Sequence, residues 1–452
     1  MDALRNDKPR LLVIPFADRY YPREKVDMVV GWSLDMLREM SLDLVVAPTV
    51  LDIPGAAQAA ELAETTAADG IILLVASWLE AANVVAAIKR VMHRPMLLWG
   101  HTSYEVPGET SRATLGAFVG AAVIRETLEE LDAKFKWIWG MPQQPEIRRQ
   151  IAGFARACNT VTRLTESRIG LLGYTALGMY TGTFDHVSLR GKIGPEIHQM
   201  DQWLLLRGMD GLKEAEVAAI GSKIQKSWRL AQNVTPGEIE RAAKMYLSLK
   251  RIVSENWLDA INVKCHYELS QVYAFTACVP LSLLADEVIC TCEGDVMASV
   301  SQMMLAYLSG LPTVYGDIHQ VLEDRLSYAC CGFNPLGMSD PAQRCVNRWA
   351  SDFVGITNSS TYLKGQKVTL ARLAAKGDSY KIHITTGTTA PWSPLQEVNS
   401  PAHAGTDVLL DDSGRWFAEN ICSNHYAMAY GDYREELELM AQILGIRVVK
   451  YR

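Results

Sequence analysis

Two carboxylates that follow short apolar runs carry the clearest chemical signal in this sequence. Glu293 comes directly after the apolar run at 288–292, and Asp317 closes the next strand-like run. Between them lies a helical pattern, which Gly310 and Pro312 are expected to end. Strand, helix and strand in this order form a right-handed crossover between parallel strands, and ligands bind beyond the carboxyl ends of such strands. We therefore expect Glu293 and Asp317 to meet at one edge of a parallel sheet.

Two carboxylates that converge on one point suit a hard divalent cation or an acid/base pair. If both stayed ionised without a cation, their repulsion would raise the pKa of one of them, which favours a metal. His425, in the polar segment 420–426, is a third candidate ligand that would complete a site for Mn²⁺ or a similar ion. The same residue types are also common in turns, so their spacing alone leaves the metal site a hypothesis.

The first third of the chain alternates short apolar runs with helical periods, which is typical of parallel α/β units. We expect an open, Rossmann-like parallel sheet in a first domain of residues 1–165. The glycines after the strand at 169–172 do not have G-x-G-x-x-G spacing, so a Rossmann-like sheet does not imply a dinucleotide here. The predicted strands of the first domain are at 11–15, 44–47, 71–76 and 96–99, and its predicted helices are at 26–37, 54–68, 78–92, 112–131 and from Pro145 onward.

A second α/β domain is predicted for residues 166–310, and it carries Glu293. A threonine N-cap, a proline and a capping-box glutamate at 235–238 mark the start of its clearest helix. Its predicted strands include 169–172, 260–263 and 288–292.

The chain beyond residue 310 changes to β-rich segments separated by clusters of Gly, Pro, Ser and Thr. This texture predicts a β-rich, barrel-like domain of residues 311–452, which carries Asp317 and His425. Its predicted strands include 368–373, 380–386 and 408–410, and a helix at 434–444 closes it.

Composition and charge argue against several classes of protein. The 452 residues are 49% hydrophobic and 21% charged, as in ordinary folded domains, and the net charge of −7 gives no electrostatic reason to expect nucleic acid or a membrane surface as partner. The nine cysteines lack disulfide-framework and C-x-x-C spacing, so we expect buried thiols in a reducing compartment rather than a zinc site. No secretory signal and no unbroken apolar span of about 20 residues is visible, so the predicted location is the cytoplasm.

Three short segments together resemble the L-fucose isomerase family, a relative of the L-arabinose isomerases. They are Cys292–Asp295, the run from Gly310 to Asp317, and Ser423–His425 with the following Tyr430–Tyr433. The resemblance implies that Glu293, Asp317 and His425 bind a catalytic Mn²⁺ or another divalent cation. It also implies that Glu293 and Asp317 are the acid/base pair that interconverts an aldose and its ketose through an enediol(ate). A hydride shift is the rival route, and the sequence does not assign which carboxylate is the acid.

Further residues are predicted to contact the sugar. Met179 lies in a segment that is similar to a family segment facing the sugar. The resemblance also implies a homo-oligomer, commonly a hexamer, with active sites near subunit interfaces. Arg19 or Arg23 in the first domain would bind an anionic group on C6 in a forked geometry, so the substrate is either a neutral hexose or pentose or a C6-anionic sugar such as sulfoquinovose. The remaining candidates for substrate binding are Asn424, Trp392, Lys264, His266 and His101.

Two other functions stay open on the sequence alone. A metal-dependent sugar lyase or epimerase would use the same enolate-stabilising residues. A non-catalytic sugar-binding protein would also have tandem α/β domains, although the carboxylate pair with a histidine argues against it. Only an isomerase interconverts an aldose and its ketose without a net change in composition, so product analysis separates the three.

Overall fold

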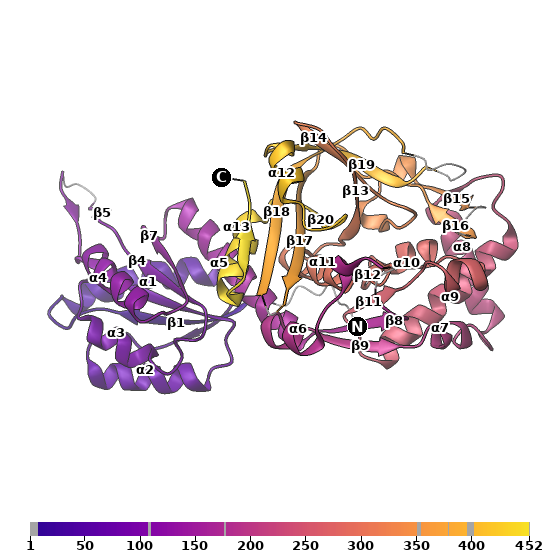
Figure 1. Cartoon of the computed structure of the whole chain (residues 1–452). Helices are drawn as coiled ribbons and strands as arrows, with labels where there is room; N and C mark the ends of the chain where they lie inside the picture. Colours follow the sequence, from indigo (N-terminus) through magenta and orange to yellow (C-terminus); the bar gives the residue numbers. More distant parts are fainter. Residues whose placement is uncertain are drawn as a thin grey trace. The chain divides into compact units, whose positions relative to one another are not determined.

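The computed structural model describes residues 8–106, 110–175, 178–349, 354–377, 379–395 and 402–451 (Figure 1). The chain divides into two compact units, one of residues 7–162 and one that contains residues 163–452. Both contain parallel α/β structure, and the C-terminal part is rich in β-strands, as predicted. Within the described ranges, no helix is long and apolar enough to cross a membrane. The finer division at residues 165 and 310 stays a prediction.

The unit of residues 7–162 contains a five-stranded parallel sheet with the strand order β2-β1-β3-β4-β7. All six residues of β3 are buried, which is typical of a parallel strand covered on both faces. The strands are β1 (Arg10–Phe16), β2 (Asp43–Val46), β3 (Gly70–Val75), β4 (Met96–Gly100) and β7 (Phe135–Trp139), with the short pair β5 (Tyr104–Glu105) and β6 (Arg112–Ala113). The helices are α1 (Arg23–Arg38), α2 (Ile53–Thr65), α3 (Ala81–Ile88) and α4 (Ala117–Glu130), and α5 (Pro145–Glu166) runs into the second unit.

The helix predicted at 112–131 is wrong at its start. Arg112 and Ala113 belong to β6, and α4 begins only at Ala117. Gly116 precedes α4 with a φ of 70°, a left-handed conformation that interrupts a right-handed helix.

The second unit begins with a four-stranded parallel sheet in the order β12-β11-β8-β9. The helix predicted from the capping box at 235–238 is confirmed as α9, because both reciprocal hydrogen bonds of the box are present. The strands are β8 (Arg168–Leu172), β9 (Glu196–Met200), β11 (Ala260–Val263) and β12 (Ile289–Cys292). The helices are α6 (His186–Lys192), α7 (Trp203–Arg207), α8 (Glu214–Ser227), α9 (Pro236–Glu255), α10 (Cys278–Leu284) and α11 (Val296–Ser309).

The β-rich part contains six antiparallel strands that pair into a closed ring. The order is β17-β20-β13-β14-β19-β18, and β18 also pairs with β17, while β21 joins β18 in parallel. These strands are β13 (Val314–Val321), β14 (Arg325–Cys330), β17 (Lys367–Lys376), β18 (Ser379–Ala390), β19 (Ala404–Leu410), β20 (His425–Tyr430) and β21 (Arg447–Val449). A separate small sheet contains β10 (Arg229–Leu230), β15 (Cys345–Trp349) and β16 (Gly355–Asn358), and the last helices are α12 (Gly414–Asn420) and α13 (Arg434–Leu444).

Helix α11 joins the parallel sheet to the ring. It contacts β11 and β12 of the sheet as well as β17 and β20 of the ring (Figure 1). Gly310 ends it with a φ of 66°, as the sequence predicted. Every residue of α11 except Ser309 is buried, so apolar residues occur on all faces of the helix, and its buried Ser299, Ser301 and Gln302 form hydrogen bonds.

The prediction that the strand after α11 runs parallel to β12 in the same sheet is wrong. β13 pairs antiparallel with β14 and β20, and β12 stays at the edge of the parallel sheet. The reason lies in the composition of β13, whose first three residues are buried and whose remaining five are partly or fully exposed. Strands of parallel sheets are buried along their whole length, whereas antiparallel strands tolerate such polar positions.

Candidate metal centre

Glu293, Asp317 and His425 meet in the second unit, although they come from two different sheets. Glu293 follows β12, Asp317 lies within β13, and His425 begins β20. The Nε2 atom of His425 is 3.3 Å from Oδ1 of Asp317 and 3.4 Å from Oε2 of Glu293. One ligand atom from each of the three residues lies within 4.8 Å of the others. The structure thus brings together the three residues predicted to bind a metal, by a route that differs from the predicted parallel sheet.

The antiparallel pairing of β13 and β20 positions two of these residues. Asp317 and His425 are direct partners in the register of the two strands. Directly opposite residues of an antiparallel pair have side chains on the same face of the sheet, only about 5 Å apart at Cβ. The spacing between the carboxylate and the imidazole is therefore set by the backbone register.

Glu293 is held in an unusual backbone conformation. Its φ is 65°, in the left-handed region that non-glycine residues rarely adopt. The neighbouring backbone is fixed by hydrogen bonds from the N–H of Glu293 to the carbonyl of Val263 and from the N–H of Gly294 to Oδ1 of Asn262, each 3.0 Å long. Strained residues persist only where surrounding contacts enforce them, and they gather at functional sites. The loop after β12 thus holds the backbone of Glu293 in a conformation that fixes the position of its carboxylate.

A buried ion pair orients the imidazole of His425. Its Nδ1 atom lies 2.9 Å from Oδ2 of Asp295, and Asp295 accepts two hydrogen bonds of 2.8 and 3.1 Å from Arg372. The side chains of Asp295 and Arg372 are completely buried. Because the carboxylate only accepts, His425 donates from Nδ1, and its Nε2 faces the other two carboxylates. A carboxylate behind a histidine in this way is the usual support of a metal-binding imidazole.

The charges of the cluster call for a cation. Burial lowers the pKa of His425, but the charges of Glu293 and Asp317 outweigh burial and raise it well above its usual range. Burial raises the pKa of Glu293, but His425 and His266 lower it well below its usual range. Burial also raises the pKa of Asp295, while Arg372 and His425 lower it to about 2. A proton on His425 or a bound metal ion would each balance these carboxylates.

The residues fit a divalent metal ion. Among the described residues, the buried Nε2 atom of His425 has no hydrogen-bond partner, which is expected of an atom reserved for a ligand. Two carboxylates and one imidazole are the donor set that Mn²⁺ and similar ions accept. Which metal binds is a proposal that the donor set supports.

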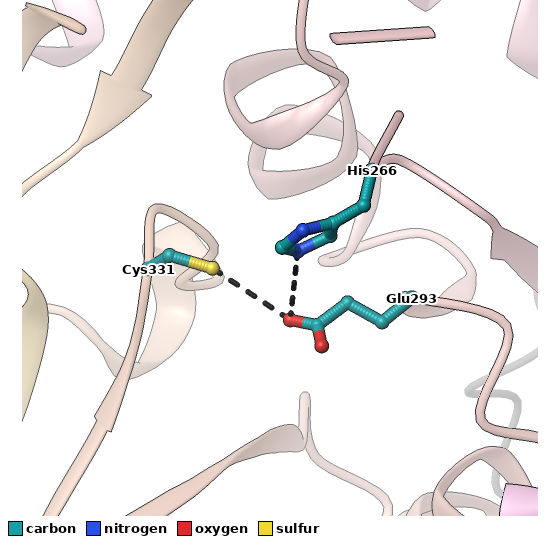
Figure 2. Close-up of side chains that lie close together, drawn as sticks. All are labelled: His266, Glu293 and Cys331. Carbon is teal, nitrogen blue, oxygen red and sulfur yellow. Dashed lines mark hydrogen bonds and ion pairs between the residues drawn. The ribbon is translucent and has the colours of Figure 1, made fainter. Parts of the chain in front are cut away.

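Three of the predicted sugar-binding residues border this cluster. Asn424 donates a hydrogen bond of 2.7 Å to Oδ1 of Asp317, and its amide nitrogen is 3.6 Å from the sulfur of Met179. His266 lies beside Glu293 (Figure 2), and its Nε2 atom is 3.7 Å from Oε1 of that carboxylate.

Lys264 and Trp392 have neighbours of their own in the second unit. The Lys264 side chain is completely buried, forms an ion pair with Glu268, and has its ammonium 4.1 Å from the centre of the Tyr174 ring. Burial lowers the pKa of Lys264. The indole of Trp392 packs over Gly405, where a Cβ atom would lie 2.4 Å from the ring. Their contact with a sugar stays a prediction.

The remaining candidates lie in the unit of residues 7–162, after the carboxyl ends of β1 and β4. Arg19 is exposed, with its guanidinium 5.4 Å from the centre of the Tyr20 ring, whereas Arg23 forms an ion pair of 2.9 Å with Asp27.

His101 is buried, hydrogen-bonds the hydroxyl of Ser33 at 2.7 Å, and has its pKa lowered to about 4 by burial. An uncharged, buried His101 fits a structural hydrogen bond better than an anion site.

Four residues that contact the cluster have no role predicted from the sequence. Asp295 and Arg372 support His425, while Tyr315 and Cys331 donate to Oε1 of Glu293 at 3.4 and 3.6 Å. One signal was available, because an arginine inside the apolar strand predicted at 368–373 requires a buried partner. No comparable signal marks Cys331.

Four curated proteins with sequence similarity to this chain are all named sulfoquinovose isomerase. The protein from Clostridium sp. (strain MSTE9) is 23% identical over 396 residues, which cover 84% of this chain and 86% of that protein. The protein from Priestia megaterium is 22% identical over 376 residues, covering 79% and 80%. The protein from Alkalicoccus urumqiensis is 21% identical over 390 residues, covering 84% and 86%. No protein-family model matches the chain.

Proposed function

We propose that this protein is a metal-dependent aldose–ketose isomerase whose substrate is sulfoquinovose, a C6-sulfonated aldose. The observation that carries the proposal is the cluster of Glu293, Asp317 and His425, in a chain whose similarity to sulfoquinovose isomerases covers most of both sequences. These relatives confirm the prediction of a sugar isomerase. They do not name the L-fucose isomerase family, so that finer relationship stays a prediction.

The two carboxylates are arranged for the proton transfers that the reaction requires. Isomerisation moves one proton between C2 and C1 and a second between O1 and O2. Glu293 and Asp317 each have an oxygen within 3.4 Å of the same imidazole nitrogen, so both reach adjacent atoms of one sugar. One takes the carbon-bound proton and the other serves the hydroxyl proton, and each such transfer contributes about 10²- to 10⁴-fold to the rate.

The other residues of the centre hold these groups in place. Glu293, Asp317 and His425 would bind the metal ion, which when bound polarises the sugar carbonyl and stabilises negative charge on the sugar oxygens. Asn424 fixes Asp317 by its hydrogen bond, and Asp295 fixes the imidazole. Such positioning lowers the reorganisation needed when the proton moves.

The direct test is to follow ketose formation by NMR with metal-free and Mn²⁺-loaded protein. Sulfoquinovose and glucose are compared, since they differ only in the group on C6. Turnover of sulfoquinovose that requires the metal supports the proposal. A change at one carbon without ketose indicates an epimerase, cleavage of the chain indicates a lyase, and binding without change indicates a sugar-binding protein; each of these contradicts it.

Isomerisation in D₂O is expected to place one deuterium at C1 of the ketose. A carboxylate that removes a carbon-bound proton exchanges it with solvent before returning it, whereas a hydride shift keeps the original hydrogen. The product is analysed by NMR and mass spectrometry after a few turnovers. Ketose formed without any deuterium would assign the hydride shift and remove the base role of Glu293 and Asp317.

Replacing Arg19 by alanine is expected to raise KM for sulfoquinovose about tenfold, since a guanidinium–sulfonate pair is a charge-assisted hydrogen bond. Arg19→Ala should not change KM for a neutral aldose that is also a substrate. Arg23→Ala serves as the matched control with a smaller effect, because Asp27 already pairs with that guanidinium. Steady-state kinetics check this, and equal KM values for wild type and Arg19→Ala would show that the sulfonate binds elsewhere.

The assembly and location of the protein are further parts of the proposal. A homo-oligomer, commonly a hexamer by family resemblance, would let the carboxyl edge of the five-stranded sheet of residues 7–162 complete an active site of a neighbouring subunit. Analytical ultracentrifugation measures the oligomeric state.

A cytoplasmic location is supported by the nine cysteines, all of them free and seven of them buried.

A further inference from the structure

The carboxylate of Glu293 faces two different groups of side chains with its two oxygens. Oε2 points to His425 of the centre described above. Oε1 lies 3.7 Å from Nε2 of His266 and 3.6 Å from the sulfur of Cys331. Figure 2 shows that both side chains approach this one oxygen. One ligand atom each of His266, Glu293 and Cys331 lies within 4.8 Å of the others. His266 follows β11 and Cys331 follows β14, so the parallel sheet and the ring each contribute one side chain.

The donor set of this second group differs from that of the first. A thiol, an imidazole and a carboxylate are the ligands that Zn²⁺ and Co²⁺ prefer, whereas two carboxylates and an imidazole suit Mn²⁺. We propose that His266, Glu293 and Cys331 form a second metal site, selective for a thiophilic divalent cation such as Zn²⁺, and that its occupation inhibits the enzyme by capturing Glu293. The inhibition rests on the proposed function, but the metal site does not.

The second site is accessible and leaves room for a fourth ligand. His266 and Cys331 are both partly exposed, and 17% of the His266 side-chain surface is accessible. Three protein ligands with one open position are a common arrangement around Zn²⁺, the fourth ligand being water. On binding, the thiol of Cys331 loses its proton to solvent as the sulfur–metal bond forms, and no oxidation or reduction occurs.

Occupation of this site would disable Glu293 in two ways. A metal ion on Oε1 occupies the carboxylate oxygen that does not face His425, so that this oxygen is no longer free to accept a proton from the sugar. It also displaces the weak hydrogen bonds that Tyr315 and Cys331 donate to Oε1. Zn²⁺ is therefore expected to inhibit without removing Mn²⁺ from Asp317 and His425.

Co²⁺ is the probe for the metal site, because a thiolate bound to Co²⁺ gives a charge-transfer absorption in the near ultraviolet. The wild type should show this band, and Cys331→Ser and His266→Gln should lose or weaken it. Cys422→Ser is the matched control, since Cys422 is the other partly exposed free cysteine, and it should keep the band. Asp317→Asn should also keep it, because this variant damages only the first centre. These binding results do not depend on whether the protein is an isomerase.

Inhibition is measured with Mn²⁺-loaded enzyme titrated with Zn²⁺, each variant being compared with its own rate before zinc. We expect Cys331→Ser to raise the half-inhibitory Zn²⁺ concentration at least tenfold and Cys422→Ser to leave it unchanged. Absence of the Co²⁺ band from the wild type, or a band and inhibition that persist in Cys331→Ser, would overturn the proposal. A Co²⁺ band combined with undiminished activity in Zn²⁺ would overturn its inhibitory part.

Discussion

Exchange of Glu293 for glutamine is expected to lower kcat/KM for sulfoquinovose at least about a thousandfold in the presence of Mn²⁺. Glutamine has nearly the same shape, but its amide neither accepts the proton nor supplies negative charge to a cation. Loss of the proton transfer alone lowers the rate about 10²- to 10⁴-fold, and weaker binding of the metal ion lowers it further. Steady-state kinetics at saturating Mn²⁺ give the size of the effect.

The control for this variant is Glu419→Gln. Glu419 lies on α12 in an exposed ion pair with Arg415, so its exchange should leave kcat/KM unchanged. The metal content of Glu293→Gln after gel filtration separates the two losses, because a protein that retains Mn²⁺ but not activity has lost the proton transfer. Activity within tenfold of wild type would exclude Glu293 as a member of the acid/base pair.

Exchange of Arg372 for methionine is expected to destabilise the protein by about 3–5 kcal/mol. Arg372 and Asp295 form an ion pair with no exposure to solvent, and removing one partner leaves an uncompensated buried charge. Chemical denaturation at pH 7 measures the change. Arg415→Met, which breaks an exposed pair, should cause no measurable change.

The Arg372→Met effect should also depend on pH. In the folded wild type the pKa of Asp295 is about 2, below the unfolded value of about 3.9. A lowered folded pKa contributes stability that is present above about pH 4 and is lost as the pH falls towards 2. The variant lacks this contribution, because without Arg372 the buried Asp295 is more stable protonated than ionised. The difference in unfolding free energy between wild type and variant should therefore shrink below pH 4, and a constant difference would contradict this assignment.

Asp295→Asn in the Arg372→Met background gives a second view of the same pair. Removing the second charge should recover part of the lost stability, because the buried carboxylate is then neutral. Activity should not recover with it, since the second exchange removes the carboxylate that orients the ring of His425. This combination separates the structural role of the ion pair from its positioning role.

Much of the candidate centre followed from the sequence, but not its geometry. Glu293, Asp317 and His425 were recognisable because each lies in a segment that resembles a known pattern. Glu293 lies in a loop after an apolar strand, Asp317 in a strand with polar positions, and His425 in a short polar segment. The assumption that β13 continues the parallel sheet was wrong, because α11 is buried on all its faces and can connect two sheets as well as two neighbouring strands. Only the pairing of Asp317 with His425 reveals why they meet.

The supporting contacts could not be derived from a single sequence. Cys331 and His266 are far apart in the chain, and nothing in their immediate neighbours indicates that both approach Oε1 of Glu293. The strained backbone of Glu293 was equally hidden, because it depends on hydrogen bonds that the N–H groups of Glu293 and Gly294 donate to Val263 and Asn262 on a neighbouring strand. Such long-range contacts depend on how separately stable elements pack, which local periodicity does not encode.

The closed ring of six strands limits how chains of this kind can vary in length. In a closed barrel the stagger of the strands is fixed, so no strand slides alone, and side chains alternate between the two faces residue by residue. A single residue inserted between Val314 and Asp317 would therefore turn the carboxylate away from His425 while leaving the ring closed. Insertions and deletions that preserve activity should accumulate in the connections between the strands, and alignments of distant relatives should be free of gaps between Val314 and Asp317 and at the start of β20.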